Sequence, residues 1–151
     1  MADPTLKQRV REEMTAAMKA GDKVRLGALR MLVTAITNRE KEVLHELSDD
    51  EVREMAAREV KRRNESIEAF EKGARADLVD RETAEREVLK AYAPEQLTEA
   101  EVDALIDAVI AETGASSQQD MGKVMGAVMG KAKGKVDGAA VQAKVRTRLG
   151  G

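Results

Sequence analysis

A run of lysines and glycines near the C-terminus has the residue types and spacing of a phosphate-binding surface. It comprises four lysines and five glycines, the glycines at intervals of four residues: Lys123, Lys131, Lys133, Lys135, Gly122, Gly126, Gly130, Gly134 and Gly138. Lysine ammonium groups contact phosphates, and glycine on a helix lets a bulky partner reach the backbone. The four lysines are therefore the predicted phosphate contacts, and Gly122 and Gly126 are the predicted points of close approach.

The same glycines also allow a purely structural interpretation. A glycine inside a helix costs about 1 kcal/mol relative to alanine, and close packing of the first three glycines against a neighbouring helix would offset that cost. Gly134 and Gly138 are expected in a turn between two helices, because glycine tolerates positive φ. In this interpretation the lysines form an ordinary solvated face, and the sequence leaves both interpretations open.

The last third of the chain carries two adjacent blocks of opposite charge. Residues 94–120 contain seven aspartates and glutamates and no lysine or arginine, a net charge of −7. Residues 121–151 contain seven lysines and arginines and one aspartate, a net charge of +6. The blocks mask each other in the overall charge of −2. If the basic block binds a polyanion, the acidic helix expected over residues 98–113 should face elsewhere, because it would repel the ligand.

Two serines before an expected helix are further candidates for anion contact. Ser116 and Ser117 offer hydroxyls and backbone N–H groups at a helix start, where anions bind well. Asp120 in the first turn favours helix capping instead, because its carboxylate would repel a phosphate.

A second basic run lies in the first half of the chain. Arg62 and Arg63 follow a lysine on an expected helix and could extend a polyanion-binding surface. The alternative is ion pairing along the helix, for example between Glu59 and Arg63 at i,i+4 spacing.

The sequence lacks the side chains of most metal and covalent catalytic sites. It contains no cysteine, which excludes disulfides, thiolate zinc sites and a cysteine nucleophile. The one histidine, His45, stands near an expected helix end, where a structural role is favoured over that of a general base. Phe70 and Tyr92 are the only aromatic residues, which argues against an RNA module built on base stacking. We predict no catalytic residues, no metal ligands and no cofactor.

No membrane association is expected from the sequence. No window approaches 18 uncharged apolar residues, the length that a transmembrane helix needs. The N-terminus has neither the basic nor the apolar region of a secretory signal. These features predict a cytoplasmic protein.

Apolar residues at spacings of three and four predict helices throughout the chain and no strands. The first helix is expected to begin at Asp3-Pro4 and the second to run from Asp22 to about Glu46, with Leu44 in its apolar stripe. Two capping boxes, Ser48 with Glu51 and Thr98 with Glu101, mark further helix starts. Gly21 and Gly114 mark helix ends, and Asp137 marks the start of the last helix.

Pro94 stops the fourth of these helices and is followed by a change in composition. We therefore predict an all-α fold with two parts. Residues 1–93 form an N-terminal four-helix unit, which a short proline hinge joins to a three-helix C-terminal tail, residues 94–151.

A family resemblance is carried most strongly by two neighbouring segments, Gly114-Ala115-Ser116-Ser117 and Asp120-Met121-Gly122-Lys123-Val124-Met125-Gly126. They resemble the hallmark of the YqeY proteins, which also occurs in the tail of GatB, a subunit of the glutamine-dependent tRNA amidotransferase. Other segments agree over almost the whole chain, among them Lys61-Arg62-Arg63, Lys72-Gly73 and Pro94 with Gln96-Leu97. One departure is Ala93, where the family usually has leucine before the proline.

The resemblance implies two all-helical parts and a tail that contacts tRNA. The expected function is a non-catalytic module that binds tRNA or another structured RNA, with a possible protein partner in tRNA aminoacylation or amidation. One alternative is an interaction adaptor that docks a partner helix on the glycines. The other is a subunit of a glutamine-dependent carbon–nitrogen ligase, although the chain has no matching catalytic set and no G-x-x-x-x-G-K-[ST] loop.

Overall fold

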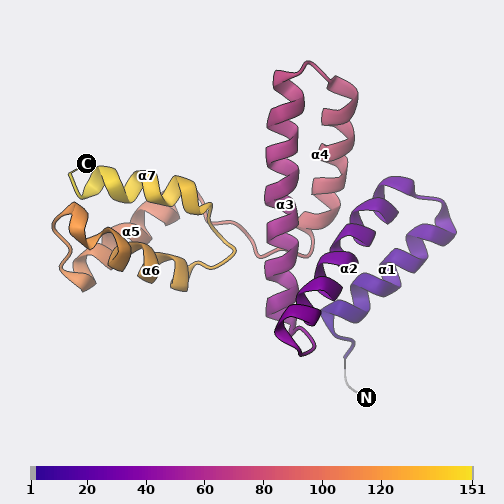
Figure 1. The fold of residues 1–151 in the computed structure, drawn as a ribbon, viewed down its shortest axis with the longest axis horizontal. Coiled ribbons are helices and arrows are strands. Elements are labelled where there is room, and N and C mark those ends of the chain that lie inside the picture. Colours follow the sequence, from indigo (N-terminus) through magenta and orange to yellow (C-terminus); the bar gives the residue numbers. More distant parts are fainter. Residues whose placement is uncertain (1–2, 151) are drawn as a thin grey trace. The chain divides into compact units, whose positions relative to one another are not determined.

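The computed structural model describes residues 3–150, which contain helices and no strand (Figure 1). The all-α prediction is therefore confirmed for this part of the chain. The helices in order are α1 (Leu6–Ala20), α2 (Lys23–Val43), α3 (Asp49–Lys72), α4 (Ala76–Lys90), α5 (Glu99–Thr113), the short 3₁₀ helix η1 (Gln118–Asp120), α6 (Met121–Lys131) and α7 (Gly138–Arg148). The chain divides into two compact units, and the boundary in the sequence falls between Pro94 and Glu95. None of the described helices is both long and apolar enough to cross a membrane.

Local capping sets several helix ends where the sequence predicts them. The Ser48 hydroxyl accepts a hydrogen bond from the Glu51 backbone N–H at 3.2 Å, and the Glu51 carboxylate accepts from the Ser48 N–H. Thr98 and Glu101 form the same reciprocal pair at 3.1 Å. Gly21 and Gly114 end their helices with φ of 72° and 66°, a conformation that glycine adopts without strain. These predicted helix starts and ends are confirmed.

Two expected boundaries were wrong. Helix α1 begins at Leu6 rather than at Pro4, because Thr5 and Gln8 form a capping box that the proline signal obscured. Helix α2 ends at Val43 rather than near Glu46, since Leu44 adopts a left-handed conformation with φ of 61°. Leu44 is consequently 88% exposed and is absent from the apolar core that its spacing predicted.

The N-terminal unit is built from two helix pairs, α1 along α2 and α3 along α4 (Figure 1). Its core consists of side chains that recur at helical spacing and are almost wholly removed from water: Val10, Ala28, Leu29, Leu32, Ile36, Leu47, Val52, Ala56, Leu89 and Tyr92. Burial of this apolar surface is the main force that holds the four helices together.

The C-terminal unit has a smaller core that is entirely aliphatic: Val102, Ile106, Val109, Val124, Val128, Val141, Val145 and Leu149. These residues form the inner faces of α5, α6 and α7, except that Leu149 directly follows α7. The segment before α5 is tied to the turn between α6 and α7. The Leu97 N–H donates to the Lys135 carbonyl at 2.9 Å, and the Gln96 amide donates to the Gly134 carbonyl at 2.7 Å. This anchoring holds the backbone of the lysine-bearing turn in place.

Candidate nucleic-acid interface

Three glycines form an exposed stripe on α6. Gly122, Gly126 and Gly130 lie one helical turn apart, and a Cβ atom added at any of them would meet nothing within 4 Å. Val124 and Val128 of the same helix are completely buried. The expectation that the glycines pack against a neighbouring helix is therefore corrected. The helix forgoes about 1 kcal/mol at each glycine relative to alanine, and no contact within the described chain compensates.

The two later glycines differ from each other. Gly134 lies in the turn after α6 with φ of 75°, as the sequence predicts. Gly138 is the first residue of α7 and does not adopt positive φ, so its expected role in the turn was wrong. The turn ends instead at Asp137, whose carboxylate accepts a hydrogen bond from the Ala139 N–H at 3.1 Å and caps α7 as predicted.

Two of the predicted lysines already contact the end of α5. Lys123 Nζ donates to the Thr113 carbonyl at 3.2 Å, one of the carbonyl groups that a helix end leaves without a partner. Lys131 Nζ lies 2.9 Å from a carboxylate oxygen of Glu112, and both side chains are about half exposed. Exposed pairs of this kind contribute little free energy and exchange partners readily.

The acidic block faces part of the basic block, whereas it was expected to face elsewhere if the basic block binds a polyanion. Lys144 Nζ lies 2.8 Å from Asp103, and Arg148 contacts both Asp103 at 3.1 Å and Asp107 at 2.7 Å. Hydrogen bonds from Lys144 and then Arg148 hold the pKa of Asp103 below its ordinary value. The α5–α7 face is therefore largely neutralised within the unit.

Three other cations of the basic block are exposed: Lys133, Lys135 and Arg146. Lys133 and Lys135 are exposed in the turn between α6 and α7, next to Gly134. Within residues 3–150, neither Lys135 nor Arg146 has an ion pair, and both are exposed. Arg146 was not among the predicted site residues. Its separation from the pairing of Lys144 and Arg148 appears only once α5 and α7 are packed.

The backbone groups at the start of η1 are already occupied. The Asp120 carboxylate accepts hydrogen bonds from the N–H groups of Ser116 at 2.9 Å and Ser117 at 3.3 Å. These two bonds, first from Ser116 and then from Ser117, lower the pKa of Asp120. The geometry favours capping over anion binding by the backbone at this helix start, and the side chains of Ser116 and Ser117 are exposed.

The two arginines of the N-terminal unit have different environments. Arg62 is exposed, with Nη1 3.4 Å from the Glu59 carboxylate. Arg63 is only 8% exposed, and its Nε lies 3.2 Å from Glu85 and 3.4 Å from Glu82 of α4. This placement corrects the expectation that Arg63 joins a polyanion surface. It also corrects the alternative pairing with Glu59, because the partners of Arg63 come from another helix.

His45 lies after the end of α2 and is exposed. One ring nitrogen is 2.9 Å from the Glu46 carbonyl, and the other is 3.9 Å from the Glu51 carboxylate. These contacts give the ring a surface role at the connection to α3. Within residues 3–150, no three histidine, aspartate or glutamate side chains are grouped closely enough to hold a metal ion.

Comparison with known proteins assigns the chain to a family. The sequence is 33% identical over 98 residues to "Altered inheritance of mitochondria protein 41, mitochondrial" of Lachancea thermotolerans, covering 63% of this chain and 52% of the relative. The protein with the same description in Pyrenophora tritici-repentis is 30% identical, over 64% of this chain and 55% of the relative. An uncharacterized Schizosaccharomyces pombe protein is 27% identical, and the match covers 62% of this chain and 76% of the relative. The chain thus spans about half the length of the first two relatives.

A family description also matches nearly the full sequence. The family of Yqey-like proteins is matched over residues 7–149, which include all seven α-helices apart from the first residue of α1. The matched range agrees with the resemblance, whose segments also span almost the whole chain. The chain therefore belongs to the YqeY family.

Proposed function

We propose that the C-terminal unit is a non-catalytic module that binds structured RNA, with tRNA as the favoured ligand. The observation that carries the proposal is the exposed stripe of Gly122, Gly126 and Gly130 on α6. These glycines lower the stability of the helix and do not pack against another part of the unit. Their advantage is therefore that they leave room for a ligand to contact the helix from outside. The smooth α6 surface suits a broad, rigid ligand such as the shallow minor groove of an RNA helix.

The charges around the stripe support a polyanion as that ligand. Lys123 lies between two of the glycines, Lys131 follows the third, and Lys133 and Lys135 extend the basic surface into the next turn. A phosphate could replace Glu112 as the partner of Lys131, because that ion pair is exposed and weak. Phosphate contacts of this kind give affinity that falls steeply with salt and read shape rather than sequence.

The direct test is titration of the full-length chain with bulk tRNA at several salt concentrations. We expect a dissociation constant of about 10⁻⁶ M or below at low salt, with a steep loss as salt rises. Replacing Lys131, Lys133 and Lys135 with glutamate should weaken binding at least about a hundredfold, since three phosphate contacts become repulsions. The matched control replaces Lys19, Lys23 and Lys41, which are exposed in the N-terminal unit. Equal loss of affinity in both variants would contradict the site.

The glycine stripe has its own test in the same assay. Replacing Gly122, Gly126 and Gly130 with alanine should weaken tRNA binding at least about tenfold while the helix becomes more stable. A variant that gains stability and keeps full affinity would remove the main support for the proposal. Salt-independent association with one protein and no RNA binding would favour the adaptor alternative instead.

Two wider parts of the proposal concern a partner enzyme, which the family resemblance suggests, and the location of the protein, which was predicted from the sequence. We propose a partner enzyme in tRNA aminoacylation or amidation, which co-purification with the tagged full-length chain would identify. Glutaminase and ligase assays of that complex test the alternative that the chain is a ligase subunit. We also propose a cytoplasmic location, which imaging of the native protein tests against the mitochondrial location that the names of two relatives state.

A further inference from the structure

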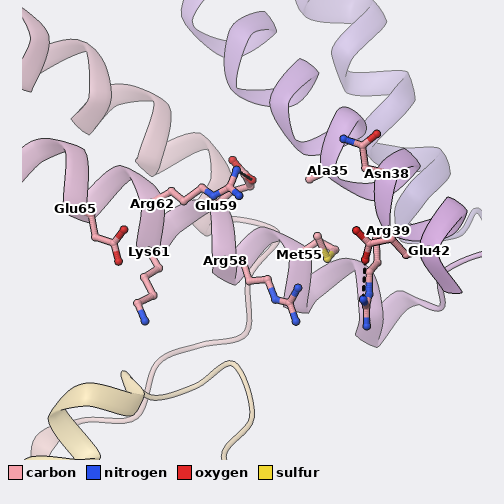
Figure 2. Close-up of a pocket in the computed structure, with 10 residues that line it drawn as sticks. All are labelled: Ala35, Asn38, Arg39, Glu42, Met55, Arg58, Glu59, Lys61, Arg62 and Glu65. Carbon is pink, nitrogen blue, oxygen red and sulfur yellow. Dashed lines mark hydrogen bonds and ion pairs between the residues drawn. The ribbon is translucent and has the colours of Figure 1, made fainter.

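A cavity of about 450 Å³ lies between α2 and α3 of the N-terminal unit (Figure 2). Its lining combines two apolar residues with polar and charged side chains of both signs: Ala35, Asn38, Arg39, Glu42, Met55, Arg58, Glu59, Lys61, Arg62 and Glu65. Its volume falls within the range of about 300–1,000 Å³ that is typical of small-molecule sites. Nothing in the RNA-binding proposal uses this cavity.

Glu59 is the unusual member of this lining. It is 3% exposed, and its Oε2 atom has no hydrogen-bond partner among residues 3–150. Its other oxygen, Oε1, accepts one long hydrogen bond, 3.4 Å from Nη1 of Arg62, whose side chain is 69% exposed. A buried carboxylate with one long hydrogen bond and one unpartnered oxygen is unfavourable, because burial removes the water that would solvate it. A ligand that donates N–H groups would complete the hydrogen bonding of Glu59.

Cations at the edge of the cavity complement this buried acceptor. Within the described part of the chain, Arg58 and Lys61 have no ion pair, and both are exposed. Figure 2 shows them extending from α3 on the side away from Glu59. Arg39 is also at the edge but is already 2.9 Å from Glu42. A ligand that reaches both regions would carry N–H donors at one end and an anion at the other.

We propose that this cavity binds a guanine nucleotide. Guanine has two adjacent donors on its Watson–Crick edge, N1–H and the N2 amino group, which match the two oxygens of one carboxylate. Adenine and cytosine place a ring acceptor beside their amino group, and uracil flanks its single N–H with two carbonyls, so each would turn an acceptor toward Glu59. Arg62 leaves Oε1 of Glu59 and, with Arg58 and Lys61, contacts the phosphate.

Calorimetric titration of the full-length chain with GMP, AMP, CMP and UMP tests the proposal. We expect GMP to bind at least about tenfold more tightly than the other three, since one bidentate contact to a base discriminates by this much. The Glu59→Gln variant should lose at least about tenfold in GMP affinity, because the glutamine amide presents one acceptor and one donor. The Glu68→Gln variant, an exposed position on the same helix outside the cavity, is the matched control. Equal affinity for the four nucleotides, or unchanged GMP binding by Glu59→Gln, overturns the proposal.

A second variant keeps the test valid if Glu59→Gln does not fold. Combined replacement of Arg58 and Lys61 with alanine alters exposed side chains only. It should weaken GMP binding at least about tenfold and leave guanosine, which has no phosphate, unaffected. Equal losses for GMP and guanosine, or no binding of any nucleotide by the wild-type chain at millimolar concentration, would refute the site.

Further titrations separate the two possible sources of the guanine and the two proposals. A single-stranded pentanucleotide with one guanosine that binds more tightly than GMP identifies the ligand as RNA, and the reverse order identifies a free nucleotide. The Lys131, Lys133 and Lys135 charge-reversal variant should retain GMP binding, since its substitutions lie in the other unit. A chain that binds GMP and fails to bind tRNA would sustain this inference and contradict the RNA-binding function.

Discussion

The two units of the chain use charged residues in opposite ways. Among residues 3–150, the charged side chains that are buried, Glu59, Arg63 and Glu85, all belong to the N-terminal unit. The C-terminal unit buries an aliphatic core and keeps its ion pairs at the surface, as between Lys131 and Glu112. Buried charges require specific partners, whereas surface pairs exchange partners with water or a ligand. The comparison separates a unit that buries charged side chains from one whose ion pairs lie at its surface.

The largest expected effect comes from removing a buried charge of the N-terminal unit. The Arg63→Ala variant leaves the buried Glu85 with only Arg81, an exposed side chain 3.5 Å away, and should lose about 3–5 kcal/mol in the free energy of unfolding. Denaturant unfolding of the full-length chain measures this loss. The Arg58→Ala variant, at an exposed position on the same helix with no ion pair among residues 3–150, should change stability by no more than about 0.5 kcal/mol. Similar losses in the two variants would mean that the buried pair is not a structural requirement.

The second prediction is an increase in stability, and it concerns the C-terminal unit. Replacing Gly122, Gly126 and Gly130 together with alanine should stabilise α6 by up to about 3 kcal/mol, because each new Cβ enters open space. The Gly134→Ala variant should instead be destabilising by about 1 kcal/mol, since the residue has φ of 75°. Thermal unfolding with hydrogen exchange in α6 distinguishes the two. Destabilisation by the triple substitution would show that the stripe is packed in solution.

A helix cap offers a matched test in the two units. Ser48→Ala and Thr98→Ala each remove the hydroxyl of a capping box and should cost about 1 kcal/mol. The first should accelerate amide exchange in α3, and the second in α5. Amide hydrogen exchange followed by mass spectrometry measures the exchange rates in α3 and α5. The comparison would fail if either substitution left exchange in its own helix unchanged.

The smallest effect is a pH dependence of the C-terminal unit. Hydrogen bonds from Lys144 and Arg148 lower the pKa of Asp103, so its stabilising contribution is present above the unfolded pKa of about 3.9 and is lost as pH falls through the folded value. The Asp103→Asn variant should unfold at a lower temperature than the wild type near neutral pH and approach it below about pH 4. Melting curves across this range measure the difference. A difference in melting temperature that stays constant at all pH values would contradict this pH dependence. The Glu95→Gln variant is the control.

Helix ends and the family were predictable because their signals are local. The capping boxes of Ser48 and Thr98 join residues three positions apart, and the glycine ends at Gly21 and Gly114 depend on a single φ angle. Such interactions form within one or two helical turns, whatever the rest of the chain does. Even here a competing local signal misled the prediction, as when Leu44 ended α2 early.

Only the tertiary structure decided how the candidate site residues are used. The partners of Arg63 lie on α4, and Lys144 pairs with Asp103 from 41 residues away, so no local spacing reveals them. The sequence by itself determined that α6 carries glycine every four residues. Packing of its valine face against the core decided that these glycines point to solvent. The physical reason is that hydrophobic burial determines which face of a helix turns to the core. The charged side chains then pair with opposite charges on the helices packed beside them.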